Sequence, residues 1–165
     1  EPEKRLVRLV KRKGNKLVDV TDTKEDTQEF LRHGAYRYEA GCGGLYGTIT
    51  DYEHMARMLC SNGMYQGKQF LRPETVCLMH TEAQKQHLEP EPGFTWGLSV
   101  KIRQNPELSG SYAHKGTYGW SGAFGTHFFV CPDEKLEAVF MTNRSDLGGS
   151  GSYISEKVEE LVFGS

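Results

Sequence analysis

The sequence predicts an α+β fold in which an antiparallel sheet, arranged as a meander, is flanked by helices. The first observation is a series of apolar, strand-like runs between residues 94 and 144 that follow one another through short turns. The second is helical periodicity in two separate segments, residues 50–60 and 150–163. Because consecutive strands with short connections usually pair with their neighbours, we expect the helices to cover the faces of one sheet.

Length and composition fit a single domain. The chain has 165 residues, of which 37% are hydrophobic and 25% are charged, and this is enough apolar material for one core. The predicted single domain, residues 1–165, contains in order a hairpin (1–20), a two-helix segment (41–82), antiparallel strands (94–144) and a C-terminal helix (150–163).

Charge and composition exclude several classes of function. A formal net charge of -2 gives no general attraction to nucleic acid, and no apolar run has the roughly 18 residues that a membrane span requires. The four cysteines have no C-x-x-C spacing and the histidines have no paired spacing, so no metal and no other cofactor is expected. Because the chain starts at Glu1 and not at a methionine, we expect a fragment of a longer protein.

The first predicted element is a hairpin over residues 6–20. The runs LVRLV and KLVDV flank the turn-forming tripeptide Lys13-Gly14-Asn15. Seven of the first sixteen residues are basic, which indicates either a patch for polyanions or the solvated face of a strand. Several acidic residues follow at once, and they favour the solvated face.

Two helices are predicted next, after a glycine-rich turn at residues 41–44. Thr50 and Glu53 have the spacing of a capping box, apolar residues then recur with helical spacing, and Gly63 stands where a C-terminal glycine is expected. Pro73 suits the first position of the second helix, which runs through Met79.

Three strands and a last helix complete the prediction. Residues 94–102 alternate between apolar and polar side chains, which predicts one strand with a buried face. Residues 123–130 and 136–142 predict two more strands joined by a turn at Pro132. The final helix has one apolar face, formed by Ile154, Val158, Leu161 and Val162.

A glycine-punctuated loop, residues 116–122, precedes the strand predicted at 123–130. Small residues lie where the loop enters that strand, so a ligand could approach the backbone closely: Ser121, Gly122, Ala123 and Gly125. The alternative is an ordinary loop, because glycine-rich entries to strands are common. The hairpin by itself does not decide between the two.

Two stretches resemble the serine β-lactamase and penicillin-binding-protein-like family, which includes related esterases. One is GCGGLYGTITDYEHMARMLCSNGMYQGKQFLRPETVCLM, and the other is GWSGAFGTHFFVCPDEKL followed by an apolar strand that ends in TNR. In that family a K-T-G, H-T-G or W-G-G triplet precedes the strand that lines the active site. Spacing to Pro132 matches the triplet to Trp120-Ser121-Gly122, whereas a longer loop would match Thr117-Tyr118-Gly119 or His114-Lys115-Gly116.

The resemblance implies the C-terminal portion of the β-lactamase/transpeptidase-like fold. The family acylates the serine of an S-x-x-K motif, and the tyrosine of a Y-x-N motif helps to move the proton. No serine of this chain has a lysine three residues further on, and no Tyr-x-Asn occurs. We therefore expect no catalytic residue in this chain, no activity of the chain alone, and a missing N-terminal segment of the same protein as its partner.

The resemblance also assigns the remaining site residues. The backbone N–H of Ala123 is the oxyanion-hole candidate, and the candidate substrate-binding residues are Tyr118, Trp120, Ser121 and Gly122. The substrate would be a small acyl compound, which is an ester, a β-lactam or a peptide. Trp120 occupies the place of a lysine or histidine in other members, and this favours an esterase-like or uncharacterised hydrolase over a true β-lactamase.

Two classes of function remain open at this point. One is the C-terminal part of a serine hydrolase, and the other is a non-catalytic binding or interaction domain derived from the same fold. Loss of neighbouring strands would leave an open sheet edge, so self-association is a further expectation. The resemblance implies a bacterial protein, in the cytoplasm or in the cell envelope.

Overall fold

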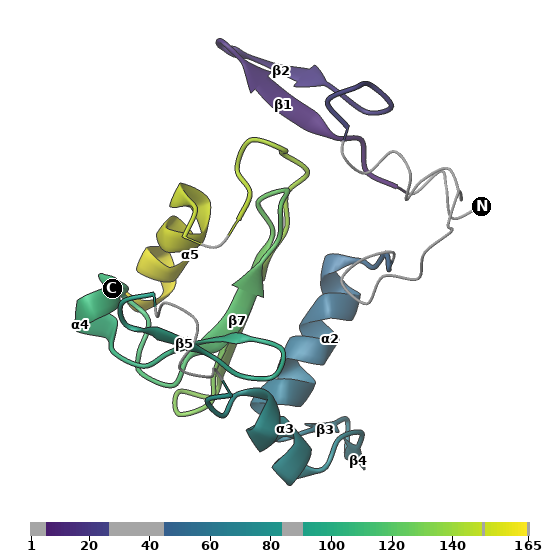
Figure 1. Ribbon diagram of the computed structural model, residues 1–165. Helices are drawn as coiled ribbons and strands as arrows, with labels where there is room; N and C mark the ends of the chain where they lie inside the picture. Colours follow the sequence, from purple (N-terminus) through teal and green to yellow (C-terminus); the bar gives the residue numbers. More distant parts are fainter. Residues whose placement is uncertain (1–5, 27–44, 84–90, 150, 165) are drawn as a thin grey trace.

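The computed structural model describes residues 6–26, 45–83, 91–149 and 151–164 (Figure 1). The glycine turn predicted at residues 41–44 lies outside these ranges. Within them a central sheet has helix α2 (Ile49–Cys60) and helix α5 (Tyr153–Phe163) on its two sides, and a separate hairpin lies beyond one end of the sheet.

The central sheet has five strands in the order in which they occur along the chain, and every neighbouring pair is antiparallel. This confirms the predicted meander flanked by helices. The strands are β5 (Phe94–Trp96), β6 (Lys101–Arg103), β7 (Tyr118–Ser121), β8 (His127–Cys131) and β9 (Leu136–Phe140).

The alternating run 94–102 is not one strand. It folds back on itself, so that β5 pairs with β6 and Phe94 lies opposite Arg103. The turn is closed by a hydrogen bond from Gly97 N–H to the Val100 carbonyl, 2.9 Å, and the end of the preceding helix packs against it. A Cβ on Gly97 would lie 2.1 Å from the Met79 carbonyl oxygen. Alternation reports only which face a side chain takes, so it does not detect a tight reversal.

The predicted loop 116–122 and the predicted strand 123–130 are also corrected. Residues 118–121 form β7, residues 122–126 form a turn, and the following strand begins only at His127. Gly119, which suggested a loop, lies inside β7. A glycine is needed at this position because β8 approaches too closely for a side chain. A Cβ there would be 2.0 Å from the Phe128 carbonyl oxygen.

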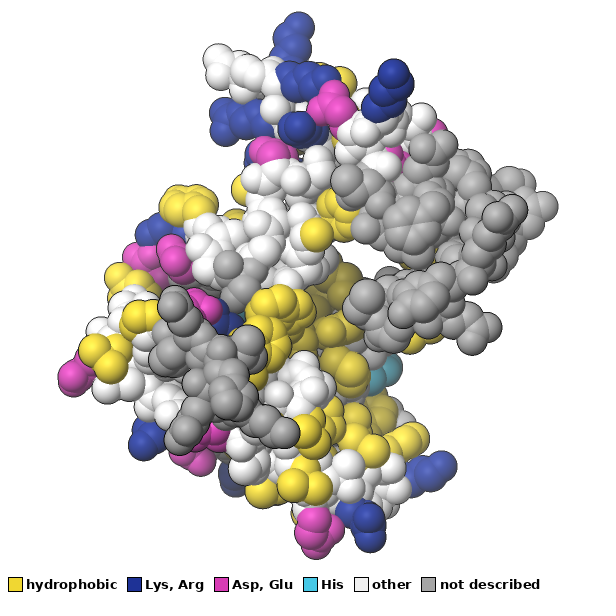
Figure 2. Space-filling model, viewed as in Figure 1, with side chains coloured by type: hydrophobic (Ala, Val, Ile, Leu, Met, Phe, Trp, Pro, Cys, Tyr) yellow, Lys and Arg dark blue, Asp and Glu magenta, His cyan; other side chains and the backbone are white. Residues whose placement is uncertain are grey.

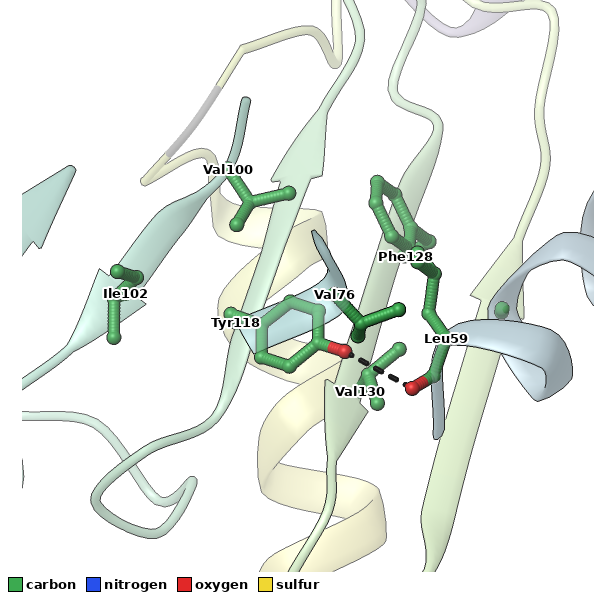
Figure 3. Close-up of a cluster of buried hydrophobic side chains, with 8 residues drawn as sticks. Leu59, Val76, Val100, Ile102, Tyr118, Phe128 and Val130 are labelled. Carbon is green, nitrogen blue, oxygen red and sulfur yellow. Dashed lines mark hydrogen bonds between the residues drawn. The ribbon is translucent and has the colours of Figure 1, made fainter. Parts of the chain in front are cut away.

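Helix α2 and helix α3 (Pro73–Met79) cover one face of the sheet. The capping box of α2 is formed by Thr48 and Asp51, not by Thr50 and Glu53 as predicted, while Pro73 begins α3 as predicted. Between the helices lies a small hairpin, β3 (Met64–Tyr65) and β4 (Lys68–Gln69). The buried cluster on this face is drawn in Figure 3 and includes Leu59, Val76, Val100, Ile102, Tyr118, Phe128 and Val130.

Helix α5 covers the opposite face of the sheet, near the short helix α4 (Pro106–Ser109) in Figure 1. The predicted apolar stripe is only partly correct, because Leu161 is 79% exposed. The residues of α5 that are fully buried are the polar Ser155 and Glu159. Glu159 is buried because the sheet supplies charged partners for it.

The N-terminal hairpin is present as β1 (Val10–Lys13) paired with β2 (Lys16–Asp19), so its first strand begins where the predicted run LVRLV ends. Its turn places Gly14 at a φ of +60°, a conformation that glycine adopts without strain. The hairpin joins the end of the sheet through a parallel bridge between Val10 and Arg144. In the part of the chain that the structure describes, no helix combines the length and the apolar character needed to cross a bilayer.

Candidate functional site: an open strand edge between two faces

The candidate site is the C-terminal end of β7, where the strand continues past its neighbour β6. In an antiparallel pair, successive residues direct their backbone groups to opposite sides. Gly122 N–H donates to Thr126 across the hairpin at 2.8 Å, while Arg103 N–H donates to the Thr117 carbonyl on the other side at 2.9 Å. This alternation directs the backbone N–H and C=O of Ser121 away from β8. The last residue pair of β6 and β7 is Lys101 with Gly119, so β6 provides no partner for Ser121.

The edge continues into the turn at Ala123, which is exposed. Among the described residues, the backbone N–H of Ala123 has no hydrogen-bond acceptor. The turn is held from behind, because Gly149 N–H donates to the Gly122 carbonyl at 3.1 Å. A Cβ on Gly148 would lie 1.6 Å from the Ala123 carbonyl oxygen, so this close packing requires a glycine. The result is a backbone donor in an exposed residue, held in place by the packing of Gly148 and Gly149.

On the α2 side of this edge, aromatic side chains form a continuous row. Trp120 packs against Trp96 of β5 in a tilted arrangement with ring centroids 4.6 Å apart, and it lies opposite Phe128 across the β7–β8 pair. Phe128 in turn contacts Tyr52 of α2 edge-to-face at 5.2 Å. Trp120 is 42% exposed and Tyr52 is 36% exposed, and Figure 2 shows hydrophobic side chains along the hollow between the sheet and α2.

On the α5 side, buried polar groups form a connected cluster. Ser121 Oγ lies 2.8 Å from His127 Nδ1, and His127 Nε2 lies 3.3 Å from Glu159 Oε1. Arg103 contacts both oxygens of Glu159, with Nη1 at 2.9 Å and Nη2 at 3.2 Å, and the Ser111 hydroxyl donates to Glu159 at 2.9 Å. Four of these residues come from β6, β7, β8 and α5 and are each less than 10% exposed: Arg103, Ser121, His127 and Glu159.

The charge state of this cluster follows from its contacts. Burial by itself would raise the pKa of Glu159, but the contacts with His127 and Arg103 together hold its pKa below the ordinary value of 4.5. Glu159 is therefore a carboxylate at neutral pH, and Arg103 has a full counter-charge. The cluster ties the strand that ends at the open edge to helix α5.

A cavity of about 460 Å³ lies against this cluster, between α5 and strands β5 to β7. Its floor includes Arg103, Thr117 and His127, and its rim includes Tyr112 and Tyr153. Among the residues that the structure describes, no three His, Cys, Asp or Glu side chains gather in a way that could hold a metal ion.

The structure distributes the predicted site residues over both faces of the sheet and its edge. Trp120 lies on the α2 face, Gly122 and Ala123 lie at the edge, and the hydroxyl of Ser121 turns to the α5 face. Tyr118 is only 1% exposed, and its hydroxyl donates to the Leu59 carbonyl at 3.4 Å inside the core (Figure 3).

The sequence argument missed the polar partners on the α5 face. Arg103 and His127 are strand residues and Glu159 is a helix residue, and their contacts join segments that are far apart in the chain. Helix α5 contains three glutamates and a lysine, so no local pattern singled out Glu159 as the buried one. The sequence argument also did not find the contact of His80, which stacks on the ring of Tyr118 with ring centroids 4.5 Å apart.

Comparison with known proteins gives three findings. The family model described as Beta-lactamase matches residues 2–162. Protein Rv1367c of Mycobacterium tuberculosis is 32% identical over 110 residues, which cover 60% of this chain and 27% of that protein. Esterase EstB of Burkholderia gladioli is 26% identical over 116 residues, which cover 69% of this chain and 28% of that protein. The chain therefore spans little more than a quarter of the length of these relatives.

One solved structure has the same fold over nearly the whole chain. It is described as EstCE1, a hydrolase with promiscuous acyltransferase activity, and it superposes with a TM-score of 0.77 at 21% identity. The match covers 97% of this chain and 44% of that chain. At this level of identity the match establishes the fold alone.

Proposed function

Because the chain belongs to the beta-lactamase family of hydrolases, we propose that it supplies one wall of an acyl-transfer site, with the edge from Trp120 to Ala123 facing the substrate. The single observation that carries this proposal is the N–H of the exposed residue Ala123, which has no acceptor and no neighbouring strand among the residues that the structure describes. The edge can accept an extended substrate, as open strand edges do.

The role proposed for Ala123 is stabilisation of negative charge. When a nucleophile attacks an ester or amide carbonyl, the carbonyl oxygen becomes an oxyanion that needs donors already in place. A backbone N–H fixed in a supported turn meets that need, because it loses no entropy on binding. Gly148 and Gly149 provide that support here.

The nucleophile is proposed to come from outside this chain. The sequence has no S-x-x-K and no Y-x-N motif, and Ser121, the serine at the edge, turns its hydroxyl away into the α5 face. A segment with the acylating serine would have to lie opposite the Trp120–Ala123 edge. The chain alone is then inactive.

Neutral esters are the favoured substrates. A β-lactam or a peptide C-terminus carries a carboxylate, and a lysine or arginine is the usual partner for such a group. Trp120 places an aromatic surface at the corresponding position, continued by Trp96 and Phe128. This surface favours apolar acyl groups by burial and by ring stacking.

A non-catalytic binding domain is the second candidate. It is supported by the same absence of a nucleophile, together with a half-exposed aromatic row that could bind a ligand without chemistry. The two candidates differ in whether an acyl-enzyme forms at the open edge or a ligand only binds there.

The first test uses the chain alone, incubated with p-nitrophenyl butyrate and with a fluorophosphonate probe. We expect no turnover above background and no covalent label. Labelling of any serine of this chain would contradict the assignment of the nucleophile to another segment.

The second test uses the product of the complete coding sequence. Ala123→Pro removes the backbone donor, and we expect kcat for the ester to fall by about 10²–10³ with little change in KM. Ala123→Ser keeps the N–H and serves as the matched control, with kcat within a few fold of the wild type. Equal activity of the two variants would exclude Ala123 from the oxyanion hole, and an inactive complete product would favour the binding domain.

A further inference from the structure

We propose that the cavity on the α5 face is a second ligand-binding site, specific for a neutral small molecule that combines hydroxyl groups with a ring. Its volume of about 460 Å³ lies in the range of cavities that hold small organic ligands. It lies between α5 and the sheet, and Trp120 and Ser121 of the strand edge are also among the residues that line it. Binding in this cavity requires no acyl transfer, so the proposal goes beyond the proposed function.

The floor of the cavity contains buried polar atoms that lack partners. Thr117 is 3% exposed and Arg103 is 7% exposed. Thr117 directly precedes β7, and its carbonyl accepts a hydrogen bond from the N–H of Arg103 in β6. Within the described residues, neither Thr117 Oγ1 nor Arg103 Nε has a hydrogen-bond partner. A buried polar atom without a partner is unfavourable, so two such atoms beside one cavity indicate a polar occupant.

The chemistry of these atoms defines what the occupant must offer. Arg103 Nε carries an N–H and needs an acceptor, while the Thr117 hydroxyl can both donate and accept. A hydroxyl group satisfies both requirements, because it also donates and accepts. A purely apolar ligand satisfies neither.

The charges around the cavity exclude an anion. Arg103 is neutralised by Glu159 at 2.9 Å, Lys101 by Glu91 at 2.6 Å, and Lys157 forms an ion pair with Glu160. Glu156 adds a further carboxylate at the rim. Because each of these cations already has a carboxylate partner, a negatively charged ligand would gain no free counter-charge and would face repulsion.

The rim supplies aromatic surface for a ring. Tyr112 is 52% exposed and Tyr153 is 68% exposed, and both line the cavity. Flat apolar faces above a polar floor suit a molecule with one apolar ring and several hydroxyl groups. An aryl glycoside has both features.

The test titrates the isotope-labelled full chain with phenyl β-D-glucopyranoside and follows the backbone amide signals by NMR. We expect saturable shifts at Arg103, Thr117 and Tyr153, which line the cavity, and smaller or no shifts at Tyr52 on helix α2, which does not. Phenyl β-D-glucuronide differs mainly by its carboxylate, and we expect it to bind about fivefold more weakly or worse.

Two variants and a matched control connect the binding to the cavity. Thr117→Val keeps the shape of the side chain and removes the partnerless hydroxyl, so it should weaken the glucoside by about fivefold without lowering the melting temperature. Tyr153→Ala, at the exposed rim, should weaken it similarly. Tyr52→Ala, an exposed tyrosine on the opposite face, should leave the affinity unchanged.

Three results would overturn the proposal. One is the absence of saturable shifts at the cavity, which would mean that only water forms hydrogen bonds with Thr117 Oγ1 and Arg103 Nε. Another is equal or tighter binding of the glucuronide. The third is an unchanged glucoside affinity in both Thr117→Val and Tyr153→Ala, which would place the binding elsewhere.

Discussion

Ser121 Oγ lies 2.8 Å from Nδ1 of His127, its direct partner across the β7–β8 pair. His127 in turn contacts Glu159 on α5, so the last residue of β7 is connected to the C-terminal helix through two side chains. The open edge begins at this same residue and continues to Ala123, two residues further along the chain. The position of this edge therefore depends on a buried polar cluster on the far face of the sheet.

Glu159→Gln should destabilise the fold. The substitution keeps the shape but removes the counter-charge of Arg103, and an uncompensated buried charge typically costs about 3 kcal/mol or more. Glu156→Gln on the exposed side of the same helix is the control and should change stability by less than about 0.5 kcal/mol. Urea unfolding at pH 7 measures both variants, and equal midpoints would show that the Arg103–Glu159 pair contributes little.

The same carboxylate should make stability depend on pH in the acid range. The pKa of Glu159 is lower in the folded state than its ordinary value of 4.5, so the unfolded chain binds its proton more readily. This contribution is complete above pH 4.5 and is lost as the pH falls below it. Urea midpoints measured from pH 7 to pH 3 should fall more steeply for the wild type than for Glu159→Gln, and parallel curves would contradict the assignment.

His80 should give a separate pH dependence near neutrality. Burial lowers the pKa of His80 below its ordinary value of 6.5, so the folded chain favours the neutral ring that stacks on Tyr118. Its contribution is present above pH 6.5 and is lost as the pH falls. His80→Phe keeps a stacked ring without a proton, and the difference in stability between wild type and variant should change between pH 7.5 and pH 5.5. A constant difference would refute the prediction.

Gly148→Ala should disturb the turn that carries Ala123. The new Cβ would meet the Ala123 carbonyl oxygen at 1.6 Å, and because backbone atoms must move we expect a loss of about 2 kcal/mol or more. Gly47→Ala is the control, because its Cβ would have only an ordinary contact at 3.8 Å. Thermal unfolding measures the stability of both variants. The NMR amide signal of Ala123 should shift only in Gly148→Ala.

Thr48→Ala should weaken helix α2 by about 1 kcal/mol, because Thr48 and Asp51 form its capping box. Thr50→Ala, at the position that the sequence suggested as the cap, should be neutral or slightly stabilising, since alanine has the higher helix propensity. Urea midpoints distinguish the two. A larger loss of stability in Thr50→Ala than in Thr48→Ala would indicate that Thr50 is the cap, as the sequence predicted.

The strand boundaries show where sequence patterns are insufficient. Gly97 and Gly119 look alike in the sequence, yet one allows a reversal between β5 and β6 and the other lies inside β7. In both cases glycine is needed because another backbone lies within about 2 Å of where a Cβ would be. Such contacts come from segments distant in the chain, and no local pattern reports them.

The sequence by itself determined the meander and the helices on its faces, because periodicity and turn residues are local properties. Only the tertiary structure decided which backbone donors stay free at the end of β7. It also decided that Tyr118 belongs to the core, and that Glu159 is buried beside Arg103 and His127. The physical reason is that hydrogen-bond saturation and charge compensation depend on which distant groups meet, and this is fixed when the sheet and α5 pack together.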